Sequence, residues 1–478
     1  MIVSKKFKGI ISAMLVVLIM ASLVGCGKQE PAPGGGTATG GGGAATPSEG
    51  FSWDMASGSK IQVMFNQHTY ADGIIQKIPE FEALTGIKVE YALTPEENYF
   101  DKLTTALNSR SGNPDIFMTG AYQLWQYAPA GYVADLTPFI EDPNMTNPDY
   151  NMDDFFPKIV DALKWDLVPG NKVGTGPQWA LPIGFETNNL AYNKKVFEER
   201  GLEPPKTMED LLKLTKELNE FDGPGTYALA IRGARNWGTI HAGYMTTYSN
   251  YGAVDFAVED GKLVSKVNSP EAIEMTEMWV DLIKAGGSPS WSSYTWYQAG
   301  ADFGAGKAAM LFDASCNGYF QNPDGASQEA GNLAWVSPPL PEGMTQINSN
   351  LWTWSLGMNE YSKNKTAAWL FMQYFTGPEY QLWAAINASA VDPARQSVFN
   401  DPEFQAVFAK SKGYAQAMEE TVDGTTIQFT PQPHFFETTT EWAATLQDIV
   451  GGKYASVEEG MNALKVKMDQ IVSDVVIE

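Results

Sequence analysis

Aromatic and hydrogen-bonding side chains gather in and beside the stretches of this chain that we predict to be loops at strand ends. The aromatic candidates are Tyr70, Tyr122, Trp125, Trp237, Trp291, Trp296, Trp352 and Trp354. The polar candidates are Gln67, His68, Gln123, Glu186, Asn188, Asp313, Asn350 and Arg395. Flat aromatic rings match the C–H faces of a sugar, and carboxylates, amides and Arg match its hydroxyls. These residues therefore predict a binding site for a carbohydrate.

Two of the candidates, Glu186 and Asp313, could also serve as the acid and base of a glycoside hydrolase or lyase. The sequence gives this alternative no further support, because it has no GxSxG, HExxH or Walker loop and no GxGxxG after a strand. None of the three His has a metal-ligand spacing, and the acidic stretch Glu141–Asp154 lacks the central Gly and final Glu of an EF-hand. We therefore expect a binding protein without a cofactor or a metal site.

Several candidates have a second interpretation. Trp352 and Trp354 share one face of a strand, so both face a cleft or both face the core. Trp291 and Trp296 lie in a polar stretch without helical period, which favours a cleft. Asp313 ends a predicted strand and suits either a ligand contact or a solvated turn. His68 fits a ligand contact and a structural position equally well.

The first part of the chain alternates between the periods of strands and helices. The expected elements are a strand at Ile61–Phe65, a helix around Ile74–Leu84, a strand at Ile87–Tyr91, a helix at Pro95–Ser109 and a strand at Asp115–Met118. Pro79 predicts a kink or a late start in the first helix. This βαβαβ order predicts a parallel sheet with right-handed crossovers. Its ligands should lie beyond the carboxyl ends of the strands, next to the loops Asn66–Tyr70 and Thr119–Trp125.

The stretch Ala180–Leu214 combines a strand end, a helix that Gly201 ends, and a helix that Thr207 and Asp210 begin as a capping box. It resembles the hinge crossing of bacterial extracellular solute-binding proteins of the maltose/oligosaccharide type, the receptors of ABC importers. The motif residues are Leu181-Pro182-Ile183, Tyr192-Asn193-Lys194, Gly201-Leu202 and Pro204-Pro205-Lys206-Thr207. Three further runs are similar to motifs of the same family, namely Phe303–Met310, Ser362–Lys365 and Pro393-Ala394-Arg395. The last resembles a loop that brings an Arg to the cleft, which implies this position for Arg395.

This resemblance implies an α/β fold of the periplasmic-binding-protein type (type II), with two lobes, each a mainly parallel sheet flanked by helices. Residues 57–185 and 309–360 would form lobe 1, and residues 186–308 and 361–478 would form lobe 2. The implied crossings lie near 184–187, 307–310 and 359–364. Strands at Ala309–Asp313 and Asn350–Met358 would belong to lobe 1, and a helix at Thr366–Phe375 to lobe 2. Such a body can close about a hinge around its ligand.

The first 25 residues predict an export signal. Lys5, Lys6 and Lys8 precede the apolar run Ile10–Val24, which is shorter than the ~20 residues needed to span a bilayer. Leu23–Cys26 resembles a lipobox, which implies a lipid on Cys26; a plain signal peptide is the alternative. Residues 26–56 are Gly-rich and should be a flexible tether. We expect a protein anchored by lipid at the extracytoplasmic face of the cell membrane.

The composition and charge of the chain limit the kinds of molecule that it can bind. The formal net charge of −24 argues against nucleic acid, and 478 residues can hold two stable domains. Of the two cysteines, Cys26 has the lipobox and Cys316 suits a small buried hydrophobe. We expect a monomer that delivers an oligosaccharide to the permease subunits of an ABC importer. A receptor for a polyol or another small solute is the alternative, because a polyol needs the same hydrogen bonds with less stacking.

Overall fold

The computed structural model describes residues 50–477. The predicted signal peptide, Cys26 and most of the predicted tether lie outside the described residues. The last residues of that tether are ordered against the body: the Trp53 ring lies 5.1 Å from Phe51 and 6.0 Å from Tyr374. The tether was therefore predicted too long at its C-terminal end, because aromatic side chains bury apolar area that Gly cannot. Within residues 50–477, no helix is both long and apolar enough to cross a membrane.

The first sheet has the strand order β2-β1-β3-β12-β4. Its strands are β1 (Lys60–Asn66), β2 (Lys88–Thr94), β3 (Ile116–Thr119), β4 (Leu181–Glu186) and β12 (Trp352–Met358). Strand β1 is parallel to β2 and β3, whereas β12 is antiparallel to β3 and β4. The helices beside it are α1 (Thr69–Thr85), α2 (Glu96–Asn108), α3 (Ala121–Tyr127), α13 (Lys365–Thr376) and α14 (Pro378–Asn387). The predicted βαβαβ unit is confirmed.

Local sequence signals explain how α1 begins and ends. His68 is the N-cap, and its Nδ1 accepts a hydrogen bond from the Tyr70 amide at 3.4 Å. Gly86 ends the helix in the left-handed region with φ of 69°. The helix starts earlier than predicted and runs through Pro79. The N-cap places His68 at the carboxyl end of β1.

The second sheet has the strand order β10-β5-β9-β6. Its strands are β5 (Asn188–Asn193), β6 (Tyr227–Ala230), β9 (Ala308–Ala314) and β10 (Leu333–Val336). The helices of this half are α6 (Lys194–Arg200), α7 (Met208–Glu217), α8 (Gly238–His241), α9 (Tyr244–Asn250), α10 (Pro270–Gly286), α11 (Trp296–Gly304), α12 (Ser315–Tyr319), α18 (Phe435–Val450) and α19 (Val457–Ile471). The predicted end of α6 at Gly201 and the capping box of α7 are both present.

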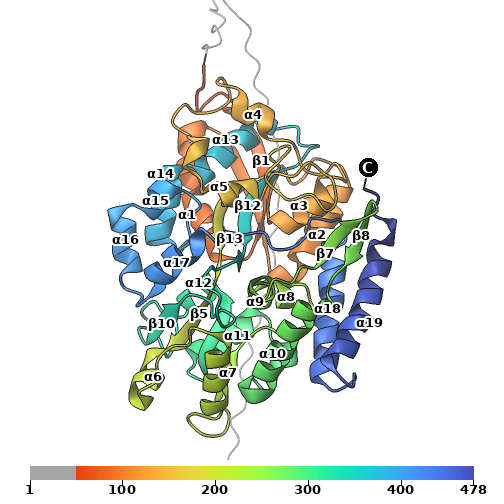
Figure 1. Ribbon diagram of the computed structural model, residues 1–478. Coiled ribbons are helices and arrows are strands. Elements are labelled where there is room, and N and C mark those ends of the chain that lie inside the picture. Colours follow the sequence, from red (N-terminus) through yellow and green to blue (C-terminus); the bar gives the residue numbers. More distant parts are fainter. Residues whose placement is uncertain (1–49, 478) are drawn as a thin grey trace, which may run out of the picture. The chain divides into compact units, whose positions relative to one another are not determined.

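The remaining elements are short or lie at the edges of the two sheets. They are α4 (Thr137–Glu141), η1 (Met152–Asp154), α5 (Pro157–Asp161), η2 (Trp291–Ser293), α15 (Gln396–Phe399), α16 (Pro402–Phe408), α17 (Tyr414–Val422) and η3 (Val472–Asp474). A hairpin joins β7 (Phe256–Glu259) to β8 (Lys262–Ser265), and β11 (Ser349–Asn350) pairs with β13 (Thr425–Thr426). Figure 1 shows β1 and β12 in one group of elements and β5 and β10 in the other.

Two elements belong to the other half than predicted. Strand β9 lies between β5 and β6 of the second sheet, with Asn189 opposite Asp313 and Leu229 opposite Met310. Helix α13 packs on β4, β12 and β1 of the first sheet. The predicted crossings at 307–310 and 359–364 are therefore wrong. Every residue of β9 is buried, so its sequence has no polar face that would indicate which sheet it joins.

The segments that connect the two sheets meet at Thr187. The chain passes from β4 to β5 at this residue, within the predicted range 184–187. Its Oγ1 lies 2.7 Å from Ser349 Oγ on β11 and 2.7 Å from Thr425 Oγ1 on β13. Three segments are thus tied side by side, which allows the two halves to bend about a common axis.

Candidate functional site

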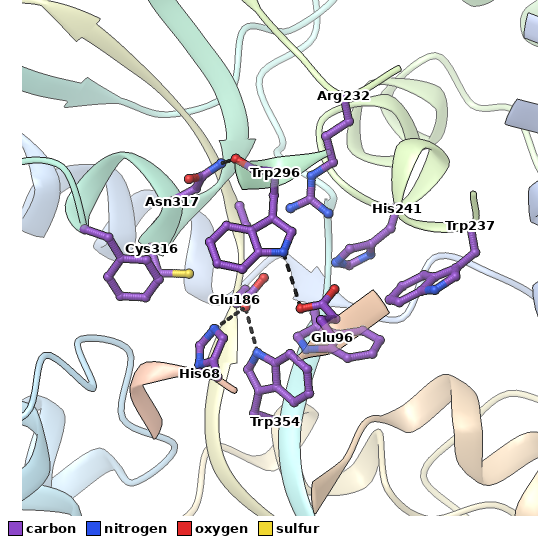
Figure 2. A pocket seen from close by; sticks show the side chains of 13 residues that line it. His68, Glu96, Glu186, Arg232, Trp237, His241, Trp296, Cys316, Asn317 and Trp354 are labelled. Atoms are coloured by element: carbon purple, nitrogen blue, oxygen red, sulfur yellow. Dashed lines mark hydrogen bonds and ion pairs between the residues drawn. The ribbon is translucent and has the colours of Figure 1, made fainter. Parts of the chain in front are cut away.

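A cavity lies between the carboxyl end of the first sheet and the facing loops of the second (Figure 2). The space free of protein atoms within its lining, including space open to solvent, is about 390 Å³. The residues that line it are His68, Glu96, Glu186, Arg232, Trp237, His241, Trp296, Ala314, Cys316, Asn317, Phe320, Trp352 and Trp354. We call this space the cleft cavity. Both halves contribute to it, so hinge motion would open and close it.

Strand ends and helix starts position the side chains from the first half. His68 follows β1, Glu96 begins α2 after β2, and Glu186 ends β4. Trp352 lies opposite Glu186 in the antiparallel β12–β4 pair, and Trp354 lies two residues further on the same face. The start of an antiparallel strand and the carboxyl ends of its neighbours share one edge of the sheet. These residues are therefore at the edge where ligands of such sheets bind.

The second half supplies a buried ion pair. Arg232 follows β6, and its guanidinium donates to Asp313 through Nε at 2.9 Å and Nη2 at 2.6 Å. Burial opposes the charge on Arg232, but the attraction of Asp313 and of Glu186 outweighs it and raises the pKa of Arg232. Asp313 is 1% exposed and also accepts from the Ala314 amide at 2.7 Å. Asp313 therefore holds Arg232 rather than lining the cleft cavity.

Burial also sets the charge of the other polar groups. It raises the pKa of Glu186 to about 8, although Arg232 and the hydrogen bond from Trp354 Nε1 at 3.0 Å work in the opposite direction. It lowers the pKa of His68 to about 3, and it holds the pKa of His241 well below its usual value. At neutral pH the two His are uncharged, Glu186 is mostly protonated and Arg232 is neutralised by Asp313. Burial also raises the pKa of Glu96, the other lining carboxyl. The shifts of the two His and the two Glu all reduce the charge that faces the cleft cavity and so favour an uncharged ligand with hydroxyl groups.

Four indole rings line the cleft cavity, and three of them pack in a row. Trp237 stacks on Trp352 with ring centroids 5.1 Å apart, and Trp352 meets Trp354 edge to face at 5.0 Å. Trp354 in turn lies 5.0 Å from the His68 ring. Trp352 and Trp354 both line the cleft cavity, which decides the alternative that the strand pattern left open. The rings pack on one another and so fill much of the space between the halves.

Three lining residues carry buried polar atoms without a hydrogen-bond partner among residues 50–477. These atoms are His241 Nε2, Asn317 Oδ1 and Trp352 Nε1. A buried polar atom left unpaired costs about 1–3 kcal/mol, so such atoms are expected to meet a partner in the working protein. The set contains an acceptor, an N–H donor and an imidazole nitrogen, which are the groups that ligand hydroxyls can satisfy.

Comparison with known proteins identifies the family. Residues 65–382 match the model of the bacterial extracellular solute-binding protein family. The chain belongs to this family. It is 40% identical to the erythritol/L-threitol-binding protein of Mycolicibacterium smegmatis. The alignment spans 450 residues and covers 94% of this chain and 92% of that protein.

Solved structures show the fold of this solute-binding protein. A ribitol complex of an ABC transporter solute-binding protein from Agrobacterium radiobacter K84 superposes with a TM-score of 0.76 at 19% identity, over 87% of this chain and 99% of that one. A maltose-bound protein of T. maritima superposes with a TM-score of 0.73 at 20% identity, over 86% of this chain and 100% of that one. The two-lobed, periplasmic-binding-protein-like fold predicted from the sequence is confirmed.

Six of the predicted ligand-binding residues of this solute-binding protein line the cleft cavity. They are His68, Glu186, Trp237, Trp296, Trp352 and Trp354. Four further predicted residues do not line the cavity but contact residues that do, as Asp313 does. Tyr70 stacks on His68 at 5.2 Å, and Trp291 Nε1 donates to the Arg232 carbonyl at 2.9 Å. Asn350 Nδ2 lies 2.9 Å from His241 Nδ1, and the Tyr122 hydroxyl donates to Asn350 Oδ1 at 3.2 Å.

The other predicted residues lie away from the cleft cavity. Gln67 is exposed on the outer side of the loop after β1. Asn188 is buried at the start of β5, where its Oδ1 accepts from the Gly243 amide at 3.1 Å. Gln123 and Trp125 are buried in α3, and the Trp125 ring packs on Phe435 at 5.4 Å. A loop position in the sequence did not determine which way these side chains point.

Arg395 was predicted at the cleft and lies elsewhere. Its Nε donates to the Thr376 carbonyl at 2.7 Å, and its Nη1 lies 3.3 Å from Asp154 Oδ2. The guanidinium is also held over the rings of Phe155 at 4.0 Å and Tyr150 at 4.8 Å. Arg395 therefore fastens the segment around Asp154 to the first half, since a buried guanidinium needs both a carboxylate and flat neighbours.

Sequence analysis missed seven lining residues. They are Glu96, Arg232, His241, Ala314, Cys316, Asn317 and Phe320. Glu96 and Arg232 follow β2 and β6 at their carboxyl ends, so the rule used for His68 also applied to them. The others lie on the short helices α8 and α12 or next to them, where the sequence shows no clear period. Cys316 is buried, as expected.

The stability of this solute-binding protein should fall as the pH rises from about 6.5, the ordinary pKa of His, to about 8. The pKa of Glu186 is about 8 when folded and ordinarily 4.5. Between these values the folded state keeps a proton that the unfolded state has released, so the stabilisation is complete below the lower value and is lost as the pH rises through the upper one. Asp392, whose pKa burial raises to about 7, acts in the same direction. His68 and His241 act oppositely below about pH 6.5, because burial lowers the pKa of both and makes stability fall in acid.

Urea unfolding at a series of pH values measures this dependence. Glu186→Gln keeps an acceptor for Trp354 but removes the titration, so the fall should be shallower by up to about 1.4 kcal/mol per pH unit. Equal slopes in the wild type and the variant would show that Glu186 does not keep its proton in the folded state.

Proposed function

We propose that this solute-binding protein is the receptor for a short linear polyol of the erythritol and threitol class and delivers it to the permease subunits of an ABC importer. The observation that carries the proposal is the relative named for erythritol and L-threitol, which is 40% identical over nearly the whole chain. This proposal replaces the expected oligosaccharide and takes up the polyol alternative.

The size and charge of the cleft cavity support a small neutral ligand. The indole rings of Trp237, Trp352 and Trp354 pack on one another and leave little room beside them for a row of sugar rings. A polyol offers hydroxyls on a short carbon chain and needs less stacking surface than a row of sugar rings. His241, Asn317 and Trp352 line the cavity, and each carries a buried polar atom that has no partner among residues 50–477 and that a hydroxyl can satisfy.

We propose binding without catalysis. Both carboxylate oxygens of Asp313 are taken up by the Arg232 guanidinium, and Oδ1 also accepts from the Ala314 amide. This carboxylate is therefore not free to act as a base beside Glu186. Incubation of the protein with polyols and oligosaccharides should leave the ligands unchanged; cleavage that Glu186→Gln abolishes would favour a hydrolase.

Calorimetric titration with a panel tests the ligand class. The panel contains erythritol, L-threitol, ribitol, mannitol, maltose and maltotriose, together with xylo- and cello-oligosaccharides. We expect the four-carbon polyols to bind most tightly. Tightest binding of maltotriose or another oligosaccharide would restore the sugar interpretation, and binding of an amine or a peptide alone would overturn both.

The family is extracellular, and we propose in addition that a lipid on Cys26 holds this member at the membrane. The charged start, the apolar run and the Leu23–Cys26 motif support the anchor. Cys26→Ser should move the protein from the membrane fraction to the soluble extracytoplasmic fraction of cells that produce it. Unchanged fractionation of the Cys26→Ser variant would contradict the anchor.

A further inference from the structure

A second, larger hollow lies next to the cleft cavity and shares part of its wall. Its empty space is about 990 Å³, against about 390 Å³ for the cleft cavity. Four residues border both spaces, namely Glu96, Arg232, Trp237 and Trp296. We call the second space the outer hollow. Phe100 and Tyr297 continue the aromatic lining into it.

The shared wall is closed by a contact between the two halves of the molecule. Trp296 Nε1, at the start of α11, donates to Glu96 Oε2, at the start of α2, at 3.3 Å. Figure 2 shows this indole lying across the cavity with its nitrogen turned toward Glu96. The contact thus joins the second half to the first at the border between the cleft cavity and the outer hollow.

Neighbouring interactions hold both partners in place. Glu96 Oε2 lies 3.5 Å from Asn66 Nδ2 at the end of β1. The Trp296 carbonyl accepts from Asn317 Nδ2 at 3.1 Å, and the Trp296 ring stacks on Tyr297 with centroids 3.7 Å apart. Glu96 is partly buried, and burial raises the pKa of its carboxyl. These contacts therefore fix the orientation of the Trp296 indole between the two spaces.

We infer that the Trp296–Glu96 contact sets the length of ligand that this solute-binding protein accepts. The inference rests on the proposed function and deepens it. A polyol that fits the cleft cavity is enclosed behind the indole, whereas a longer chain would have to displace it. Without the indole, the cleft cavity and the outer hollow become one space along which a longer polyol can extend.

Trp296 is the bordering residue whose removal tests the inference most cleanly. Arg232 neutralises Asp313, so its loss disturbs the buried ion pair. Trp237 packs on Trp352 and on Phe436 at 5.5 Å, so its loss disturbs the wall of the cleft cavity itself. Trp296 is only partly buried, and its removal should leave the fold intact.

The experiment compares Trp296→Ala with the wild type by calorimetric titration of erythritol and of the longer polyols mannitol and maltitol. The readout is the ratio of the affinity for the long ligand to that for the short one, because the lost ring can weaken both. We expect this ratio to rise by at least about tenfold. Trp296→Phe, which keeps a ring but not the N–H donor, should give a smaller rise. Trp383→Ala removes a partly buried indole of α14 that borders neither space and should leave the ratio unchanged.

Equal loss of affinity for long and short ligands in Trp296→Ala would overturn the inference, because the indole would then be a contact surface only. Failure of the wild type to bind any polyol would overturn the proposed function instead. In that case the same ratio is taken from maltose and maltotriose, and an unchanged ratio again overturns the length limit. Binding of no ligand in the panel would overturn both.

Discussion

Arg232→Ala is expected to lower the free energy of unfolding of this solute-binding protein by about 3–5 kcal/mol. Arg232 and Asp313 are 9% and 1% exposed, and two N–H groups of the guanidinium reach the two carboxylate oxygens. Removal of the cation leaves Asp313 charged, buried and without its counter-ion. The cost comes mainly from this stranded carboxylate and less from the pair itself.

Urea unfolding at pH 7 measures the loss as a shift of the midpoint at constant slope. Arg235→Ala is the matched control, because Arg235 is three residues away and its ion pair with Asp448, at 2.8 Å, has an exposed guanidinium. Exposed pairs contribute about 0–1 kcal/mol, so this control should be nearly as stable as the wild type.

A double variant separates the stranded charge from lost packing. Arg232→Met together with Asp313→Leu removes both charges and keeps apolar volume, and such exchanges are often neutral or stabilising. We expect the double variant to recover most of the stability that Arg232→Ala loses. A loss in Arg232→Ala no larger than that in Arg235→Ala would show that water reaches Asp313 and that the site is not sealed.

The sequence predicted those parts of the fold whose causes are local. Gly201 and the Thr207–Asp210 box act within one helical turn, so their effect is visible in a few residues. The alternation from Ile61 to Met118 predicted the βαβαβ unit, because each apolar period belongs to a single element. The rule that ligands lie at carboxyl strand ends then found His68 in the loop Asn66–Tyr70, whereas the second loop it indicated, Thr119–Trp125, contributes no lining residue.

The assignment of elements to lobes depended on contacts that the sequence does not display. The seven buried residues of β9 would suit the middle of either sheet. Its pairing with Asn189 of β5 and Leu229 of β6 shows that it belongs to the second sheet. Arg395 shows the same difficulty for a side chain. Its motif resembles one that brings Arg to a cleft, but Asp154 and two aromatic rings hold the guanidinium in the first half.

The expectation of an oligosaccharide depended on counting the indoles as binding surface. In the structure Trp352 packs against both Trp237 and Trp354, and Trp291 lies beneath Arg232. Indoles that pack on one another occupy space that a ligand would otherwise fill. Many tryptophans near a cleft can therefore make it small, and the sequence alone does not distinguish stacking on a sugar from stacking on another indole.

Trp354→Ala is expected to weaken binding of the proposed polyol by at least about thirtyfold, which corresponds to the ~2 kcal/mol that defines a binding hot spot. Trp354 is buried, lines the cleft cavity and contacts Trp352 and His68. Its Nε1 is also the donor to Glu186 Oε1. The change removes apolar wall from the ligand and leaves Glu186 without the group that orients its carboxyl.

Trp354→Phe separates these two causes. Phenylalanine keeps an aromatic wall but has no N–H, so an affinity close to that of the wild type would assign the effect to the wall. An affinity close to that of Trp354→Ala would assign it to the orientation of Glu186. Trp279→Ala is the control for unfolding, because this indole is buried in α10 and packs on Tyr244 at 5.5 Å, away from the cleft cavity.

Calorimetry at a temperature where all variants are folded makes the comparison one of affinity alone. Trp279→Ala should lose about 3–5 kcal/mol of stability and retain its affinity, whereas Trp354→Ala should lose affinity whether or not it loses stability. If Trp354→Ala binds erythritol as tightly as the wild type does, the polyol does not lie against this indole. The ligand would then occupy another part of the cleft, and the lining of the cleft cavity could not be the reason for its selection.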